Sequence, residues 1–403
     1  MERRSPGGQD AVRRHNLSRL LRRVHVRGST SRSELTALTG LNRSTVKTLT
    51  ADLVAAGLLR ESAPVAGGGA GRPSIQVEPE SERLFVLALD IGVEHLRAVR
   101  VGLGGTVLDR RELHQAHGDF DVSRTLRRVQ RLARDLLERA PHDAVCVGIG
   151  VGVCGVVSAD EGLVRFAPNL GWLDVPLGRL LAAKLGTSLR ISIGNDGDLG
   201  AMAEHLRGAA VGLSDVVYIS GEVGIGGGII LGGRPMTGVG GFGGEIGHMS
   251  VNPQGRTCRC GRRGCWETEI GDEAVLLTTG AAPGTELGEV LTAYAAGARW
   301  PQAGMRRVGR WLGVGVVNLV NVFNPQAVVF GGVSRLLFEA TEPIVRAALD
   351  SALAGPRDQV QLRSALLGDD SIAVGAAELA FAPLLEDPLG LLARPGLALR
   401  APA

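Results

Sequence analysis

Four side chains that bind zinc readily stand close together in the second half of the chain. His248 is followed by Cys258, Cys260 and Cys265, with glycines inside the cysteine run. Three thiolates and one imidazole form a closed tetrahedral set for Zn2+, which leaves no position for an activated water. The spacing therefore predicts one structural zinc ion per chain. Cysteines packed as small apolar side chains are the alternative, but four arginines in the same loop make it too polar for a core.

The charges of the chain divide into a basic head and a mildly acidic body. Residues 1–60 contain 12 Lys and Arg against 4 Asp and Glu, a net charge of +8, while the other 343 residues have a net charge of −5. This asymmetry is typical of a nucleic-acid-binding module joined to another domain. With 44% hydrophobic and 21% charged residues, the chain has a globular composition, which excludes a disordered protein.

No segment of the sequence has the pattern of a membrane span or a secretion signal. The N-terminus has no apolar stretch, and the long uncharged run 312–334 contains three asparagines and a proline. Such a run is typical of a buried helix followed by a strand. We therefore expect a cytoplasmic protein without membrane contact, in which the cysteines stay reduced.

Residues 11–60 carry the pattern of three short helices. Apolar residues repeat at helical spacing over 17–24, the second helix opens with a capping box at Ser31 and stops at Gly40, and the third starts at Asn42. Short strands at 58–60 and 75–77 flank a Gly-rich loop. These features predict a winged helix-turn-helix. A small three-helix interaction domain is the alternative, but it leaves the net charge, the glycine turn and the wing unexplained.

The third helix would enter the DNA major groove with its first residues at the base edges. Arg43 can bridge guanine O6 and N7, and an arginine at the wing tip suits a narrow A·T minor groove. One winged helix reads few base pairs, so we expect a homodimer, or a tetramer made of two dimers, on a pseudo-palindromic operator of double-stranded DNA. The predicted DNA-binding residues are Arg32, Arg43, Ser44, Thr45, Lys47, Thr48 and Arg72.

From residue 84 onward, apolar strands alternate with longer helices, which predicts an α/β body of two lobes. We expect a winged helix-turn-helix domain and linker over 1–82 and a first lobe over 83–195. A second lobe, 196–382, should contain the zinc loop and a last helix that returns to the first lobe. Residues 383–403, rich in Pro and Leu, should form a loose tail.

Several motifs accompany the zinc loop in a fixed order. They are Gly71-Arg72-Pro73-Ser74, Pro168-Asn169-Leu170-Gly171-Trp172, Asn195-Asp196, Gly244-Glu245-Ile246-Gly247-His248, the cysteine run that ends at Glu267, and Gly331-Gly332-Val333-Ser334. In this order, behind a winged helix, they resemble the ROK family of bacterial repressors and sugar kinases, over about residues 14–380. The resemblance implies an actin-like (ribonuclease H-like) sugar-kinase body, with a hexose-type sugar bound between its lobes.

Matching this resemblance residue by residue implies a set of sugar-contact positions. They are Asn169, Asn195, Asp196, Glu245, His248 and Glu267. Carboxylates and amides bind neighbouring hydroxyls, and a site built of them rejects analogues that leave these groups unpaired. His248 would use one ring nitrogen for zinc and the other for the sugar. For any single residue, such as Asn169 or Glu267, capping or fixing a loop is the alternative role.

The phosphate loops decide between a kinase and a sensor. In the family's kinases Asp196 would be the catalytic base, and two Gly-Thr loops would hold the ATP phosphates. Here Glu94 and Val223 stand in place of the two threonines, and Glu222 adds a second negative charge. Each uncompensated carboxylate would oppose ATP by on the order of 1 kcal/mol or more. We therefore expect no catalytic residue and no enzyme activity.

These features favour a sugar-responsive transcriptional regulator, a repressor of carbohydrate uptake and metabolism genes that a sugar effector releases from DNA. Two alternatives stay open. One is a bifunctional ATP-dependent sugar kinase with a DNA-binding head, and the other is a regulator whose body binds a protein partner.

Overall fold

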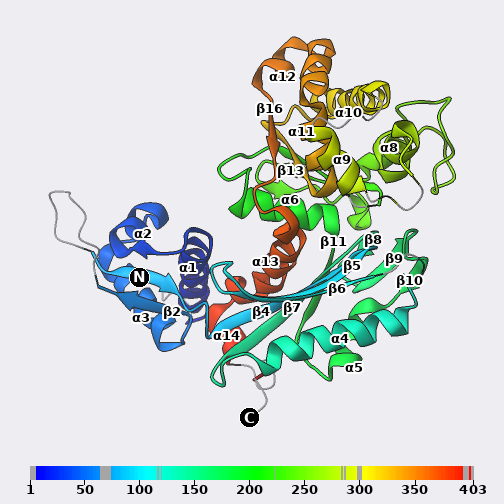
Figure 1. Cartoon of the computed structure of the whole chain (residues 1–403). Coiled ribbons are helices and arrows are strands. Elements are labelled where there is room, and N and C mark those ends of the chain that lie inside the picture. The colour runs from blue at the N-terminus through cyan, green and yellow to red at the C-terminus, as the bar shows by residue number, and fades with distance from the viewer. Residues whose placement is uncertain are drawn as a thin grey trace.

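The computed structural model of the chain describes residues 6–63, 74–115, 118, 120–221, 223–282, 285, 287–296, 302–393 and 399–400. The head, blue in Figure 1, lies beside a body of two lobes, and helix α13 lies between these lobes. The wing loop with Arg72, and also Glu222, lie outside the described residues. No helix in the described ranges is long and apolar enough to cross a membrane.

The head contains the predicted three helices and a small sheet. These elements are α1 (Pro6–Arg27), β1 (Thr30–Ser31), α2 (Arg32–Thr39), α3 (Arg43–Ala55), β2 (Leu59–Ser62) and β3 (Gln76–Pro79), with strand order β1-β3-β2. The capping box at Ser31 and Glu34 is confirmed, and Asn42 caps α3 by accepting from the Thr45 amide at 2.8 Å. Helix α1 begins earlier than predicted. The sequence did not indicate its first turns because they carry no apolar periodicity.

Each lobe is built on one sheet, and the two sheets have the same plan. The first contains β4 (Leu84–Ile91), β5 (His95–Gly102), β6 (Val107–His114), β7 (Val145–Val153) and β11 (Ile191–Asn195), in the order β11-β7-β4-β5-β6. The second contains β12 (Val216–Gly221), β13 (Ile225–Leu231), β14 (Arg234–Pro235), β15 (Ala327–Gly331) and β16 (Gln361–Ser364), in the order β14-β13-β12-β15-β16. In each sheet, the first three strands along the chain pair in antiparallel fashion. The last two strands are added in parallel, on the other side of the first strand. This duplication is the plan of the predicted actin-like fold.

Helices and short strands complete the lobes. The first lobe has α4 (Val122–Glu138), α5 (Leu177–Leu185) and a small sheet of β8 (Val156–Ser158), β9 (Leu163–Ala167) and β10 (Trp172–Val175). The second has α7 (Trp266–Ile270), α8 (Asp272–Thr279), α9 (Leu287–Ala295), α10 (Gln302–Phe323), α11 (Gly332–Ala348), α12 (Ala354–Gln359) and the 3-10 turns η1 (Val239–Gly241), η2 (Ile246–His248), η3 (Leu349–Ser351) and η4 (Gly368–Asp370).

Two helices pack against each other between the lobes. Helix α6 (Asp196–Arg207) packs on the second sheet, and α13 (Ser371–Glu386) packs on β4 and β7 of the first. Their close approach requires a glycine, because a Cβ at Gly375 would lie 2.0 Å from the Leu199 carbonyl oxygen. The contact between the lobes is therefore made by two backbones held at close range.

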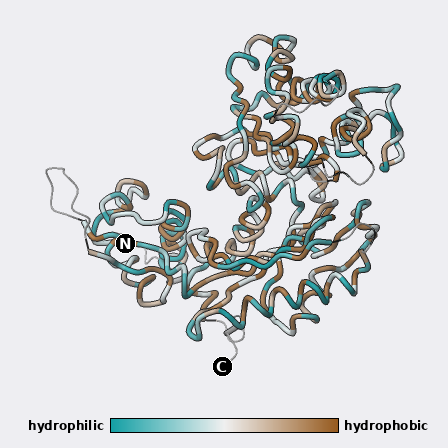
Figure 2. Tube along the Cα trace, viewed as in Figure 1, coloured by the Kyte–Doolittle hydropathy of each residue, from teal (hydrophilic) through white to brown (hydrophobic). Residues whose placement is uncertain are grey.

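The head shares a hydrophobic core with the body. Leu17 and Leu20 of α1 belong to one buried cluster with Val86 of the first sheet and Phe381 of α13. Figure 2 shows hydrophobic segments where the head meets the C-terminal helices. The Ser18 hydroxyl also donates to the Leu385 carbonyl oxygen at 2.5 Å. The head is thus packed on the body as well as connected to it by the chain.

The C-terminal segment differs from the loose tail that we expected after residue 383. Leu384 and Leu385 are buried, helix α14 (Pro388–Leu392) follows, and β17 (Leu399–Arg400) pairs with β7. The expectation rested on composition alone. The leucines are ordered because they have a partner surface, which α1 of the head provides.

A histidine, an arginine and a glutamate form a contact between the head and the body, which we call the junction. His25 of α1 accepts from the Gly104 amide through Nδ1 at 2.9 Å, so its Nε2 carries the proton that it donates to Glu378 Oε2 at 2.9 Å. The Arg207 Nε, at the end of α6, donates to Glu378 Oε1 at 2.6 Å. The junction (His25, Arg207 and Glu378) joins α1, α6 and α13.

Candidate functional site

A cavity of about 270 Å³ lies between the lobes. Its lining includes all the predicted sugar-contact residues, which are Asn169, Asn195, Asp196, Glu245, His248 and Glu267. They come from the β9–β10 turn, the end of β11, the start of α6, the residues around η2, and α7. Because four separate segments of the chain converge here, the cavity depends on how the two lobes are placed.

Two of these residues also have local structural roles. Asn195 caps α6, since its Oδ1 accepts from the Asp198 amide at 3.1 Å, and its Nδ2 donates to the Gly155 carbonyl oxygen at 3.0 Å. One Asp196 oxygen accepts from the Gly197 amide at 2.9 Å. These bonds fix both side chains at the cavity wall. Asn195 therefore both caps α6 and lines the cavity, so the alternative role as a cap does not exclude a place in the cavity.

Asp198 of α6 is a largely buried carboxyl outside the cavity lining, and sequence reasoning missed it. Burial, with a smaller contribution from Glu245, raises the pKa of Asp198 to about 7. Burial and Glu267 also raise the pKa of Glu245. The Asp198 Oδ1 is buried and has no hydrogen-bond partner among the described residues. In the sequence, Asp198 looks like an ordinary acid in the first turn of a helix, so no pattern distinguished it.

We expect Asp198→Asn to stabilise the protein at alkaline pH. A folded-state pKa of about 7, well above the unfolded value of about 3.9, means that ionisation of Asp198 costs stability as pH rises between these values. The neutral amide should therefore raise the free energy of unfolding by about 1–4 kcal/mol above pH 7 and by little near pH 4. Urea unfolding across this pH range measures the difference. Asp358→Asn, at an exposed carboxyl, controls for loss of one charge, and equal curves for both variants would contradict the prediction.

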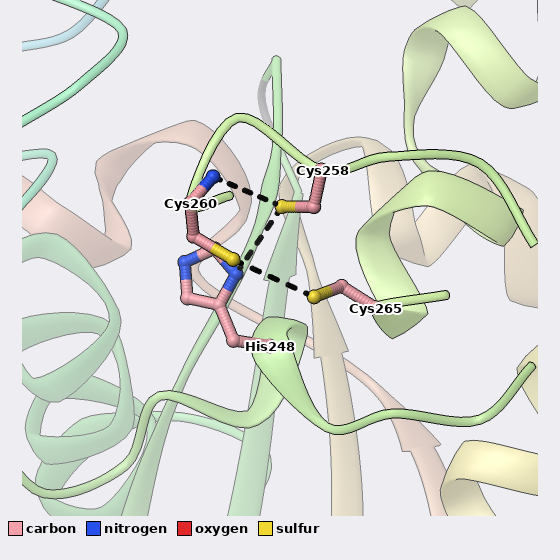
Figure 3. Close-up of side chains that lie close together, drawn as sticks. All are labelled: His248, Cys258, Cys260 and Cys265. Carbon is pink, nitrogen blue, oxygen red and sulfur yellow. Dashed lines mark hydrogen bonds between the residues drawn. The ribbon is translucent and has the colours of Figure 1, made fainter. Parts of the chain in front are cut away.

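The four predicted zinc ligands lie together at the edge of the cavity (Figure 3). Their ligand atoms are all within 4.8 Å of one another. His248 Nδ1 is 3.7 Å from Cys258 Sγ, and Cys260 Sγ is 3.6 Å from Cys265 Sγ. Tetrahedral Zn2+ with bonds of about 2.0–2.3 Å needs ligand atoms about 3.3–3.8 Å apart, so the donor set fits this ion. Nδ1 faces the cysteines, which leaves Nε2 of His248 for the cavity.

The loop that carries the cysteines is held by backbone contacts. Gly264 has a φ of +68°, and a Cβ there would lie 1.6 Å from the Asn252 carbonyl oxygen. The Cys258 amide donates to the Arg262 carbonyl oxygen at 2.7 Å, which closes the turn around Cys260. Helix α7 begins directly after Cys265, so the same loop places Glu267 in the cavity wall.

On the head, the predicted DNA-reading residues lie on an exposed part of α3. Arg43 and Lys47 are exposed and, within the described part of the chain, make no ion pair. The Ser44 hydroxyl donates to Asn42 Oδ1 at 2.7 Å, and the Thr48 hydroxyl donates to the Ser44 carbonyl oxygen at 3.1 Å. Arg32 forms an ion pair with Glu61 of β2. Arg43 and Lys47 are therefore the most available cations of this set.

Helix α1 adds residues beside α3 that sequence reasoning missed. Gln9, Arg13 and Asn16 line a groove together with Ser44 and Thr45. Arg13 NH2 is 2.8 Å from Asp52 Oδ2. The signal in the sequence was the run of polar residues before the first apolar repeat, which extends the helix next to the DNA-reading surface.

The protein is a winged helix-turn-helix packed on a duplicated, actin-like α/β body, with a polar cavity between the lobes. The ROK family model matches residues 86–382 of this chain. The chain belongs to the ROK family.

Several relatives that match both the head and the body of this chain are regulators. The xylose repressor of Caldicellulosiruptor bescii is 27% identical over 379 residues, which cover 89% of this chain and 93% of that protein. A solved ROK family transcriptional regulator, a homologue of the E. coli MLC protein, is 25% identical with a TM-score of 0.76, and the match covers 95% of this chain and 98% of that one. A ROK glucokinase from Streptomyces griseus, solved with glucose and AMPPNP, is 27% identical with a TM-score of 0.64 and covers 73% of this chain and 99% of its own.

Proposed function

We propose that this protein is a sugar-responsive transcriptional repressor. Its head binds double-stranded operator DNA as part of a homodimer, and a small sugar binds between the lobes. The observation that carries the proposal is the cavity in which the six polar residues converge, behind a head that shares a core with the body. The xylose repressors among the relatives support the same class of effector.

In this proposal, the carboxylates of Asp196, Glu245 and Glu267 accept hydrogen bonds from sugar hydroxyls. Asn169 and Asn195 supply amide groups, and Nε2 of His248 makes a further contact. A site with this many polar groups favours a ligand that pairs all of them, because an unpaired buried polar group costs about 1–3 kcal/mol.

The proposal includes the absence of kinase activity. Val223, in place of one threonine of the family's kinases, lines the cavity, and Glu94 stands in place of the other threonine. Neither a valine nor a carboxylate offers a hydroxyl to a phosphate oxygen, and phosphoryl transfer depends on such positioning contacts. ATP-dependent phosphorylation of a hexose would favour the bifunctional kinase. Calorimetry that detects no sugar binding would favour a protein partner.

The experiment that tests the proposal is a two-stage binding assay. DNA that the protein selects from a random library supplies the operator, and fluorescence anisotropy then measures operator affinity with D-xylose, D-glucose or N-acetylglucosamine. The proposal expects one of these sugars to change the dissociation constant. Selected DNA that binds the protein equally with every sugar would overturn it.

We also propose that His248, Cys258, Cys260 and Cys265 hold one zinc ion, which would fix the loop that carries His248 and Glu267. Cys258→Ser is expected to lose the metal and to weaken sugar binding at least tenfold, since mutations around metal sites commonly cost 10–100-fold. Elemental analysis and calorimetry measure the two effects. Cys146→Ala, which removes a buried thiol in β7, should retain one zinc per chain. Metal-free wild-type protein with full sugar binding would contradict the prediction.

A further inference from the structure

Arg259 makes a contact across the cavity that the predicted sugar residues do not explain. Its NH1 donates to Asn169 Oδ1 at 2.8 Å, and its side chain lines the same cavity. Asn169 belongs to the β9–β10 turn of the first lobe, whereas Arg259 belongs to the cysteine loop of the second. The bond therefore joins the two walls of the cavity.

This contact determines which way the Asn169 amide faces. A guanidinium has donors and no acceptor, so Asn169 must give its oxygen to Arg259. Its two N–H donors are then left for other partners, and Nδ2 lies on the side of Gly224, another residue of the cavity wall. Without Arg259, the Asn169 side-chain amide could flip and present its oxygen to the cavity instead of its N–H groups.

The orientation gives the cavity two chemically different sides. Asn169 donates hydrogen bonds, whereas Glu245 and Glu267 accept them when ionised. A sugar hydroxyl between the two sides can accept from the amide through its oxygen and donate its own proton to a carboxylate. A deoxy position can do neither, so a site arranged in this way discriminates strongly against the analogue that lacks the hydroxyl.

We propose that Arg259 is a positioning residue that sets hydroxyl specificity in the cavity by fixing the Asn169 amide. The inference rests on the proposed sugar-binding function and deepens it. The residues on both sides of Arg259, Cys258 and Cys260, belong to the candidate metal set. A metal ion held by this set would order the loop and would thereby also position the Arg259 guanidinium. In this way the cysteines would influence which sugar hydroxyls the cavity selects.

The test compares three variants with the wild type, using D-glucose, D-xylose and the monodeoxy-D-glucoses in calorimetry. Arg259→Ala should weaken binding of the best sugar about tenfold, as for the loss of a positioned hydrogen bond of about 1.4 kcal/mol. It should also reduce discrimination against one deoxy-glucose, which identifies the hydroxyl next to Asn169. Arg259→Lys keeps a donor and should recover part of both effects. Arg262→Ala, in the same loop but outside the cavity lining, should change neither.

A second measurement needs no sugar. Hydrogen exchange at the Leu170 and Gly171 amides, which close the turn that carries Asn169, should be faster in Arg259→Ala than in the wild type or in Arg262→Ala. Unchanged exchange together with unchanged sugar discrimination would overturn the role of Arg259. If no sugar binds the wild type, the proposed function fails, and the exchange measurement still decides whether Arg259 fixes the turn.

Discussion

Glu378→Gln is expected to destabilise the folded protein by about 3 kcal/mol, because it weakens the junction between the head and the body. Burial alone would raise the pKa of Glu378, but His25 and Arg207 overcome this and lower it to about 2. A carboxyl whose pKa falls from 4.5 to about 2 favours the folded state by about 3 kcal/mol at neutral pH. This agrees with the loss of about 3–5 kcal/mol that follows when one partner of a buried pair is removed.

The sign of the pH dependence follows from the same pKa. The contribution of Glu378 is complete above about pH 4.5 and is lost as pH falls towards 2, because the folded state then takes up the proton. The difference in unfolding free energy between Glu378→Gln and the wild type should therefore be largest at neutral pH. Chemical denaturation at pH 7 and at about pH 3 measures it.

A second glutamate of α13, Glu386, provides a matched control because it also faces α1. Glu386 is exposed and lies 4.0 Å from Arg22 of α1, so Glu386→Gln removes a surface ion pair between the same two helices. Such pairs contribute about 0–1 kcal/mol. A similar loss of unfolding free energy in both variants would contradict the prediction that the junction stabilises the protein more than a surface ion pair does.

Local signals in the sequence were sufficient for much of the head and for the metal set. Ser31 with Glu34, and Asn42, mark helix starts through contacts within three residues, so the chain itself contains the whole interaction. The cysteine spacing is similarly local. The six cavity residues are spread over four separate segments of the chain, and only the resemblance to a known family predicted that they lie together.

Contacts between distant segments could not be predicted in this way. His25 appeared as one histidine in a basic helix, and its partner Glu378 follows 353 residues later. Asp198 and Arg259 likewise acquire their roles from a neighbour in another segment, Glu245 and Asn169 respectively. Burial decides the importance of His25 and Asp198, whereas a contact across the cavity decides that of Arg259. No periodicity in the sequence indicates the burial or the distant contact of a single polar side chain.

Sugar binding is expected to weaken operator binding by about 5–150-fold, which corresponds to a coupling free energy of about 1–3 kcal/mol. Helix α6 gives a direct route for this effect. It begins at Asp196 in the cavity wall and ends at Arg207 in the junction with α1. A shift of α6 on lobe closure therefore reaches the head through buried hydrogen bonds. Half-sites lie about 34–36 Å apart, so a changed separation of the two heads in a dimer cannot satisfy both at once.

Asp196→Ala separates this effect from DNA binding itself. The variant should bind the selected operator as the wild type does, but the sugar should no longer change its dissociation constant. Glu289→Ala removes an exposed acid of α9 outside the cavity lining and should keep the full response. Because coupling is reciprocal, operator DNA should weaken sugar binding to the wild type by the same factor. Equal operator affinity with and without sugar would exclude sugar-induced release, whereas tighter binding with sugar would make the sugar a corepressor, with α6 moving the heads towards the half-site spacing instead of away from it.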